Sequence, residues 1–321
     1  MMAAGHYPVM LGEAIEALAL GGGVAEKVVD ATFGGGGHAR RILRELGPEG
    51  RVVGIDRDPE AAIRASRLME EDRRFTFRPG TYDEVLEDLV EEGVSANSVL
   101  FDLGLSSYQV DEPRRGFSYV QEGPLDMRMD PSRGESAADF LNAAEAAKIT
   151  EVLARYGDVP RGEARRVAEE IARRRPLGTT LELSEAVRSA VGWKERGGNP
   201  AKRVFQALRV YVNDELGALE RALRAVERLL VPGGRFVAIT FHSGEDRLVK
   251  RFIYERAGRC VCPPELPVCV CGARPIFRKG LVRRPSAREI EENPRSASAR
   301  LRSAVRTSEL LEADDALGKP P

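Results

Sequence analysis

The chain has 321 residues, more than the roughly 100 to 200 of a typical single domain, so we expect one large domain or two smaller ones. With 42% hydrophobic and 31% charged residues, its composition is that of a globular protein and excludes a disordered or fibrous chain. The net charge of −1 argues neither for nor against a nucleic-acid partner.

The sequence contains no sign of a membrane or secretory segment. No run approaches the roughly 18 apolar residues of a membrane span, and the start, Met1 to Gly12, lacks the blocks of a signal peptide. We therefore expect a cytoplasmic protein with no membrane partner.

The first hundred residues alternate short apolar runs with helical patterns, which indicates a parallel sheet built from βαβ units. Asp58 is the expected N-cap of the second helix, with Pro59 at its first position. The predicted strands are 28–31, 51–56, 75–77 and 98–102, and the predicted helices are 39–46, 59–70 and 83–92.

The next clear strand, Arg235 to Phe241, follows about 130 residues later, and the long gap indicates an insertion. We predict a sheet domain made of 1–113 and 203–321, interrupted by a helical domain, 114–202, that recognises the substrate. The inserted helices are expected near 136–156, 162–174 and 183–191.

One long amphipathic helix is predicted from Val204 to Leu230, because apolar residues recur along one stripe. A tight turn, Leu230 to Gly234, then leads into the strand, and a helix follows from Glu245 to Arg256. The segment from Arg247 to Arg306 holds 15 Lys and Arg against 5 Asp and Glu. It is either a surface that contacts a polyanion or an ordinary solvated face.

All four cysteines lie in one short stretch, as Cys260-Val-Cys262 and Cys269-Val-Cys271. Four thiolates can bind zinc, although C-x-C pairs are less usual than C-x-x-C, so inert thiols are the leading alternative and we commit to no metal. Metal analysis of the purified protein distinguishes the two.

The run Gly34-Gly-Gly-Gly-His-Ala39 satisfies the dinucleotide pattern G-x-G-x-x-A, so a nicotinamide oxidoreductase is one alternative. Asp30, however, stands at the end of the strand, four residues before the turn. A carboxylate there would repel a pyrophosphate but would attract the cationic end of a sulfonium donor. This favours a methyl donor.

Three acids, Asp30, Asp56 and Asp102, end predicted parallel strands, whose carboxyl ends line the ligand crevice of an open α/β sheet. Asp56 is suited to both hydroxyls of a ribose, since the capping role nearby is better filled by Asp58. For any single acid a solvated strand end is the commoner explanation, but the three together favour a site.

Several ordered motifs resemble the small-subunit ribosomal RNA methyltransferase H family, also called MraW, over nearly the whole chain. The matching stretches are His6-Tyr-Pro-Val-Met10, Asp30-Ala-Thr-Phe-Gly-Gly-Gly-Gly-His38, Ile55-Asp-Arg-Asp-Pro59, Asp102-Leu-Gly-Leu-Ser-Ser107, Arg115-Gly-Phe-Ser118, Gly123-Pro-Leu-Asp-Met-Arg-Met-Asp130, Phe205-Gln-Ala-Leu-Arg209, Val212-Asn-Asp-Glu-Leu216, Phe241-His-Ser-Gly-Glu-Asp-Arg247 and Glu292-Asn-Pro-Arg-Ser296.

The resemblance implies a Rossmann-like, class I methyltransferase sheet with an inserted helical subdomain. It also implies methyl transfer from S-adenosylmethionine, by in-line displacement, to N4 of a cytidine in the decoding centre (P site) of 16S ribosomal RNA. The donor-binding residues that it implies are Gly36, Gly37, His38, Asp56, Tyr82, Asp102 and Gln109. Tyr82 departs from the usual phenylalanine and Gly244 from the usual leucine.

The cytosine amine is a weak nucleophile, so an acceptor for one of its hydrogens should help. Asp102 is our candidate for that catalytic role, with a purely donor-holding role as the alternative. Phe117 or Tyr119 is expected to stack on an exposed base. His242 and Ser243 are expected to contact the base or phosphate, unless they form hydrogen bonds within their own loop.

A non-catalytic RNA-binding or assembly protein is the third reading, which would make the donor pocket vestigial. The expected partner is the small ribosomal subunit. The sequence determines neither the subunit's stage of assembly nor the protein's oligomeric state, for which a homodimer is one option.

Overall fold

The computed structural model describes residues 8–22, 25–192, 198–258 and 275–307. The chain divides into two compact units, which we call the sheet unit (Met1–Gly104 with Ala218–Pro321) and the helical unit (Leu105–Gly217). The helical unit starts 9 residues before the expected insertion 114–202 and ends 15 residues after it. Among the described residues, no helix is long and apolar enough to cross a membrane.

The sheet unit contains a seven-stranded sheet in the order β3-β2-β1-β4-β5-β7-β6. Neighbouring strands from β3 to β5 are parallel, whereas β7 is antiparallel to both β5 and β6. The mixed α/β class and the Rossmann-like sheet are thereby confirmed. The strands are β1 Lys27–Asp30, β2 Arg51–Asp56, β3 Phe75–Pro79, β4 Ala96–Asp102, β5 Leu230–Thr240, β6 Phe277–Arg283 and β7 Arg300–Arg306.

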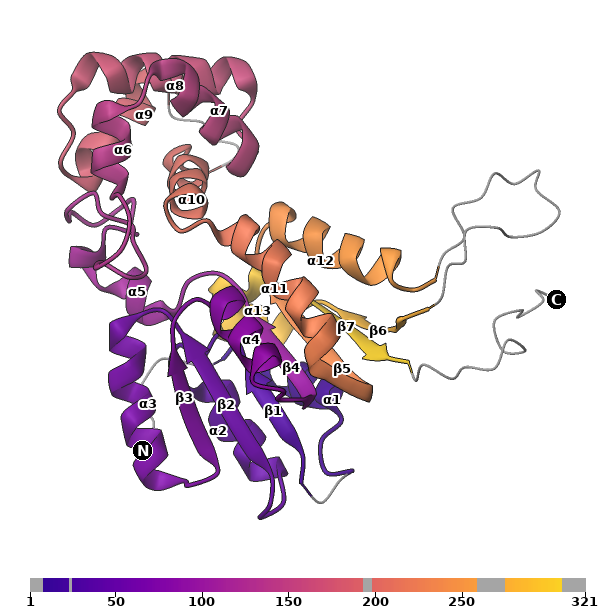
Figure 1. Cartoon of the computed structure of the whole chain (residues 1–321). Coiled ribbons are helices and arrows are strands. Elements are labelled where there is room, and N and C mark those ends of the chain that lie inside the picture. Colours follow the sequence, from indigo (N-terminus) through magenta and orange to yellow (C-terminus); the bar gives the residue numbers. More distant parts are fainter. Residues whose placement is uncertain (1–7, 23–24, 193–197, 259–274, 308–321) are drawn as a thin grey trace, which may run out of the picture. The chain divides into compact units, whose positions relative to one another are not determined.

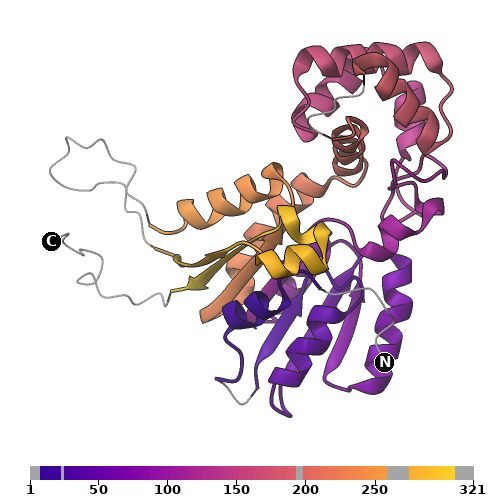
Figure 2. The ribbon, with the colours of Figure 1, turned by 180° about the vertical axis from the view of Figure 1, so that it is seen from behind.

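Helices cover both faces of this sheet, as expected when strands are apolar on both sides. Helices α4, α11 and α12 lie on the face toward the viewer in Figure 1, and α1, α2 and α3 lie on the face seen in Figure 2. The bounds are α1 Leu11–Leu18, α2 Gly37–Glu45, α3 Pro59–Glu71, α4 Tyr82–Glu91, α11 Glu215–Leu229, α12 Ser243–Glu255 and α13 Ala287–Glu292, followed by the 3₁₀ turn η2 Pro294–Ser298.

The predicted start of α3 is confirmed. The side chain of Asp58 accepts a hydrogen bond from the Glu60 amide at 3.0 Å, and Pro59 occupies the first helical position. Pro59 has no N–H to leave unsatisfied there, so both residues favour a helix beginning at this point. The strand before α3 therefore ends at Asp56, which leaves that carboxylate at the edge of the sheet.

The helical unit packs around its own apolar core, which includes Phe140, Ile149, Leu183 and Phe205. The 3₁₀ turn η1 Pro113–Arg115 follows its first helix. The helices are α5 Ser107–Asp111, α6 Ala137–Ala143, α7 Ala146–Tyr156, α8 Arg161–Arg174, α9 Thr180–Val191 and α10 Ala201–Val212. The first predicted helix, 136–156, is thus two helices, because the chain is extended at Ala144 and Glu145.

The single long helix predicted from Val204 to Leu230 is wrong. Helix α10 ends at Val212, and Asp214 adopts a left-handed conformation (φ 48°) before α11 begins. The Asn213 side chain accepts a hydrogen bond from Met129 N at 2.7 Å and donates one to Met127 O at 2.8 Å. These contacts hold the break in place, and the apolar stripe alone does not reveal them.

Two further expectations for the C-terminal half need correction. The predicted turn from Leu230 to Gly234 lies within β5, where the pairing with β4 shifts register between Ala96 and Ser98. The extra residues are accommodated as a bulge in a strand that began earlier than expected. The sequence pattern also predicts neither β6 nor β7. The four cysteines lie outside the described residues, so the choice between a zinc site and inert thiols stays open.

Candidate functional site

The three strand-end acids lie at one edge of the sheet. Asp30 on β1 pairs in register with Gly54 on β2 and with Leu100 on β4, and Asp102 pairs with Ile239 on β5. Asp56 and Asp102 are the last residues of their strands. Because parallel strands end at the same edge, this arrangement builds an acidic crevice mouth where ligands bind in open α/β sheets.

The glycine turn follows β1 and leads into α2. Gly36 has a positive φ of 75°, and a Cβ atom there would lie 2.7 Å from the ring of Phe33, so only glycine fits. Gly37 begins α2, and its missing side chain makes room for Pro8. Arg64 braces the turn by donating to the carbonyl of Gly34 at 3.0 Å. No sequence pattern pointed to Arg64.

Asp56 accepts hydrogen bonds from the backbone of two loops, the glycine turn and the start of the segment that leads into α3. One carboxylate oxygen accepts from Gly34 N at 2.8 Å and the other from Asp58 N at 2.9 Å. Burial raises the pKa of Asp56, an effect that those two hydrogen bonds oppose. Each oxygen of a carboxylate can accept more than one hydrogen bond, so Asp56 can hold the glycine turn and still bind ribose hydroxyls.

Asp30 and His38, which are buried, and Asp102, which is partly buried, form a polar cluster. Nδ1 of His38 lies 3.6 Å from Oδ2 of Asp102, and the amide of Asp102 donates to the Thr32 hydroxyl at 2.6 Å. Thr32 therefore links the glycine turn to β4, a role that sequence reasoning missed although the residue lies within the motif that begins at Asp30. Within the described chain, Oδ2 of Asp30, Nε2 of His38 and Oδ1 of Asp102 have no hydrogen-bond partner.

The electrostatics of this cluster favour a cationic ligand. Burial raises the pKa of Asp30 to about 7, and burial together with the charges of Asp30, Glu245 and Glu289 raises that of Asp102 well above its usual value. Burial lowers the pKa of His38 to about 4, so this ring is neutral at pH 7. Such carboxyls would be stabilised by a positive charge, which a sulfonium donor carries.

Tyr82 is the first residue of α4 and lies partly buried beside the crevice strands. Its ring packs edge to face on Phe101 of β4, with 5.6 Å between the ring centroids. The ring of Tyr82 is thus held in place by the core of the sheet unit. A ring held in this way is suited to pack against a flat base. Its contact with the adenine of a donor stays a prediction.

Three of the predicted residues, Gln109, Phe117 and Tyr119, belong to the helical unit. Gln109 is buried in α5, where its side-chain oxygen accepts from Ser106 N at 3.1 Å and forms a capping box. Phe117 is only 7% exposed and packs in the core of that unit, which counts against a stacking role for its ring. Tyr119 is partly buried and packs edge to face on Phe205. A donor contact by Gln109 stays a prediction.

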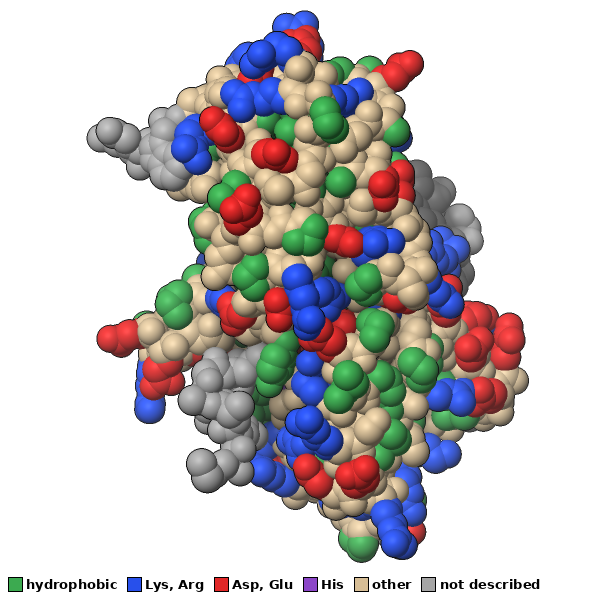
Figure 3. Space-filling model, turned by 90° about the vertical axis from the view of Figure 1, so that its left-hand side faces the viewer, with side chains coloured by type: hydrophobic (Ala, Val, Ile, Leu, Met, Phe, Trp, Pro, Cys, Tyr) green, Lys and Arg blue, Asp and Glu red, His purple; other side chains and the backbone are tan. Residues whose placement is uncertain are grey.

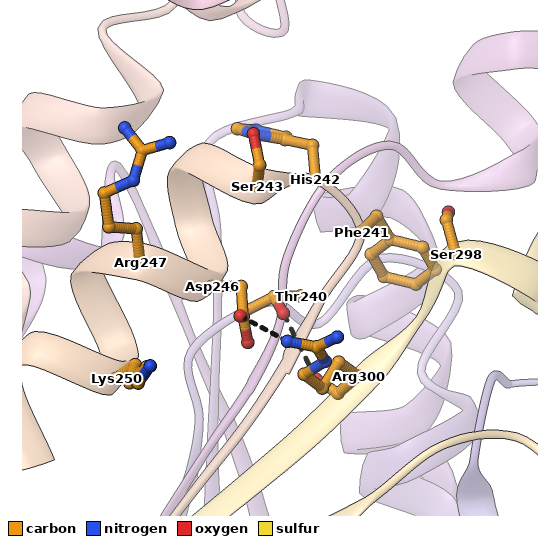
Figure 4. Close-up of a pocket in the computed structure, with 9 residues that line it drawn as sticks. All are labelled: Thr240, Phe241, His242, Ser243, Asp246, Arg247, Lys250, Ser298 and Arg300. Atoms are coloured by element: carbon orange, nitrogen blue, oxygen red, sulfur yellow. Dashed lines mark hydrogen bonds and ion pairs between the residues drawn. The ribbon is translucent and has the colours of Figure 1, made fainter.

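His242 and Ser243 stand at the start of α12, directly after β5 (Figure 4). His242 forms hydrogen bonds within its own loop, because its Nδ1 accepts from Gly244 N at 3.2 Å and so caps the helix. Ser243 is exposed. Both residues line a cavity of about 440 Å³, together with the basic residues Arg247, Lys250 and Arg300 that sequence reasoning had not singled out individually.

Charge of both signs is spread over the surface. Figure 3 shows that on the visible face Lys and Arg side chains are interspersed with Asp and Glu, in keeping with the net charge of −1. Several arginines of the basic segment 247–306 form ion pairs, among them Arg256 with Glu227 and Arg302 with Asp246. Ion pairs within the fold therefore neutralise part of the positive charge counted along that segment.

Comparison with known proteins identifies the family. Residues 3–307 match the MraW methylase family. The chain is 72% identical over 309 residues to ribosomal RNA small subunit methyltransferase H of Rubrobacter xylanophilus (96% of this chain, 98% of the relative). It is 46% identical to the protein of that name from Symbiobacterium thermophilum (95% and 98%).

Among solved structures, an rRNA methylase from Streptococcus thermophilus matches with a TM-score of 0.40 at 10% identity, covering 93% of this chain and 94% of that one. The family assignment does not depend on that likeness, since the sequence matches span nearly the whole chain. The chain belongs to the MraW methylase family of S-adenosylmethionine-dependent methyltransferases.

Proposed function

We propose that this protein transfers a methyl group from S-adenosylmethionine to the exocyclic N4 of a cytidine in the decoding centre (P site) of 16S ribosomal RNA. The relatives' name supports ribosomal RNA of the small subunit as the substrate class. The cytidine N4 position is the finer part of the proposal. A cytoplasmic location follows from that substrate, and the protein's partner is the small subunit.

The single observation that carries methyl transfer at this edge is a cluster of buried, unpartnered polar atoms at two strand ends and at the start of α2. Within the described chain, Asp30, His38 and Asp102 each leave one polar side-chain atom without a hydrogen bond. Leaving a buried polar atom unsatisfied costs about 1–3 kcal/mol. A cluster of such atoms is expected where a ligand completes the hydrogen bonds.

We assign the donor contacts to residues around this cluster. When bound, S-adenosylmethionine supplies an electrophilic methyl group on a positively charged sulfur. Asp56 accepts hydrogen bonds from the ribose hydroxyls, and Tyr82 packs on the adenine. The turn residues Gly36, Gly37 and His38 let the backbone approach closely, while Asp30 and Asp102 favour the positive charge.

Asp102 has the second task of positioning the nucleophile. Its unpartnered Oδ1 can accept a hydrogen bond from the cytosine amine, which restores lone-pair character to N4. A cationic donor beside it lowers its raised pKa, so that it is ionised when both substrates are present. It can then take the proton that N4 loses on methylation. The alternative, a purely donor-holding Asp102, would leave binding of the cytidine unchanged in an Asp102→Ala variant.

The decisive test is the position of the transferred methyl group. Small subunits from a strain lacking the modification are incubated with the protein and labelled S-adenosylmethionine, and the labelled nucleotide is located. We expect label on N4 of one cytidine of 16S RNA. Label on another base contradicts the substrate assignment, and RNA binding without transfer would favour the non-catalytic assembly protein instead.

A further inference from the structure

The cavity beside α12 is positively charged. It is lined by Arg247 and Lys250 from α12, by Arg300 at the start of β7, and by the single acid Asp246. These four side chains carry 3 − 1 = 2 net positive charges. Figure 4 shows Arg247 and Lys250 extending from α12, with Arg300 on the neighbouring strand.

The acid in this cavity is already neutralised. Asp246 accepts from Arg300 at 2.7 Å and from Arg302 at 2.7 and 3.1 Å. Arg247 and Lys250, by contrast, are exposed and, as far as the described chain extends, form no ion pair or hydrogen bond. The two cations are therefore available to a ligand from outside the protein, which must be an anion.

The helix start does not supply the anion contacts. Its first-turn amides are capped by the His242 side chain, and Glu245 stands in the same turn. Binding would instead come from the two cations and the hydroxyls of Ser243 and Ser298, which also line the cavity. Its volume of about 440 Å³ is within the roughly 300–1,000 Å³ of small-ligand pockets and admits a phosphate group.

The position of the cavity relates it to the methyl-transfer site. Thr240, at the end of β5, lines the cavity. The residue before it, Ile239, pairs with Asp102 in the register of β4 and β5. The amide of Leu103 also donates to the carbonyl of Ile239 at 2.9 Å. A polyanion that presents one base to Asp102 would thus have its backbone within reach of the neighbouring strand end.

We propose that the cavity beside α12 binds a backbone phosphate of the RNA substrate, held by Arg247 and Lys250, and thereby orients the nucleotide beside the methyl-transfer site. This inference rests on the proposed function, since it takes RNA as the substrate. Phosphate contacts fix register without reading sequence, so the cavity contributes affinity and orientation rather than choice of base.

The first experiment measures methylation of small subunits that lack the modification. We expect Arg247→Gln and Lys250→Gln each to raise KM about fourfold at 0.15 M salt, and the double variant about tenfold, because fewer counterions are released on binding. The value of kcat should stay within twofold, since neither residue touches the reacting atoms. Donor affinity, measured on the same proteins, should be unchanged and shows that the sheet unit is folded.

Arg251→Gln is the matched control. This arginine lies next to Lys250 on the same helix and is similarly exposed, but it pairs with Glu220 at 2.8 Å and does not line the cavity. We expect its KM to stay within twofold of the unsubstituted protein. If Arg251→Gln raises KM as much as Arg247→Gln, the effect is one of general charge and the cavity assignment is wrong.

A binding assay identifies the phosphate and does not depend on catalysis. The affinity of each variant for a single-stranded oligocytidylate is measured over a range of salt concentrations. The slope of log K against log salt concentration should be less steep by about 0.7 for each phosphate that the protein no longer neutralises. The double variant should also show little preference for phosphodiester over uncharged methylphosphonate linkages. Inorganic phosphate that binds as tightly as the oligonucleotide would indicate a site for a free anion and overturn the RNA assignment.

The two proposals fail separately. If the protein transfers no methyl group to small subunits but shows the expected salt dependence, the proposed function is wrong and the RNA-phosphate site stands. If methyl transfer is found and the double variant keeps the KM and salt dependence of the unsubstituted protein, the cavity assignment is wrong and the proposed function stands.

Discussion

Two fully buried polar side chains, one in each compact unit, differ in whether their hydrogen bonds are satisfied. In the helical unit, the Thr180 side chain is fully buried, donates to Gln121 O at 2.7 Å and accepts from Gly123 N at 3.1 Å. In the sheet unit, Asp30 is equally buried, yet one of its carboxylate oxygens has no partner in the described chain. Paired groups connect segments of the fold and stabilise it, whereas unpaired ones lower stability.

This difference distinguishes buried polar groups that stabilise the fold from those that bind a ligand. Satisfied polar groups such as Asn213 connect loops that lie far apart in sequence, and they need no ligand. Among the acids of the described chain with an unsatisfied buried oxygen, Asp30 and Asp102 lie at strand ends of the sheet, where a bound donor would pair with them. Four predictions test this contrast, from the largest expected effect to the smallest.

The largest effect concerns Asp30 and pH. Its folded-state pKa is raised from 3.8 to about 7, so its contribution to stability is full below about pH 4 and is lost as pH rises through about 7. The Asp30→Asn variant has no carboxyl to ionise at this position, so it does not lose this stability as the pH rises. We expect the free energy of unfolding of the variant, minus that of the unsubstituted protein, to grow by about 3 kcal/mol from pH 4 to pH 7, measured by denaturant unfolding.

Asp72→Asn is the matched control for that pH series. Hydrogen bonds from Arg74 lower the pKa of Asp72 against the smaller, opposite effect of burial. Its stabilising contribution is therefore present at neutral pH and lost as the solution becomes acidic. The stability difference should therefore change with the opposite sign. A difference for Asp30→Asn that does not vary between pH 4 and 7 would contradict the assignment of Asp30 as a destabilising buried acid.

The second effect concerns catalysis at Asp102. Asp102→Ala should lower the rate of methyl transfer by about 100-fold, the lower end of what a positioned acceptor contributes, without lowering the unfolding temperature. Removing a partly buried carboxyl whose buried oxygen is unsatisfied relieves a desolvation cost. Asp88→Ala, an exposed acid on α4, should leave the rate unchanged. Turnover of Asp102→Ala within twofold of normal would exclude the role.

The third effect belongs to the helical unit. Asn213→Ala leaves Met127 O and Met129 N without their side-chain partner, which should cost about 2 kcal/mol. Hydrogen exchange of amides in that unit should be faster, while donor affinity stays normal. If donor affinity fell as strongly as the protection of those amides, the polar contacts of the helical unit would not be merely structural.

The smallest effect separates two acids only two residues apart. Asp56→Ala should weaken S-adenosylmethionine binding about tenfold, the loss of one charge-assisted interaction. Asp58→Ala removes the N-cap of α3 and should cost about 1 kcal/mol of stability with donor affinity within twofold. Titration calorimetry and thermal unfolding on both variants check this, and equal losses of affinity would refute the separate roles.

Much of the site followed from local sequence signals. Asp58 and Pro59 predicted the start of α3, and the apolar strand before them predicted that Asp56 lies at the end of β2. The break after Val212 and the strands β6 and β7 did not follow, because they depend on contacts with residues distant in the sequence, such as Met127 for the break. Phe117 shows the same limit, since its burial comes from the packing of the surrounding helices.

The sequence by itself determined the parallel sheet, the acids at its strand ends and the glycine turn, because periodicity, caps and positive-φ glycines act over a few residues. Only the tertiary structure decided which polar atoms are left unpaired and which cations are available to a ligand. Arg302 and Arg247 look alike in the sequence, yet one neutralises Asp246 and the other lines the cavity beside α12. The difference arises because the partner of a charge is set by segments brought together in space.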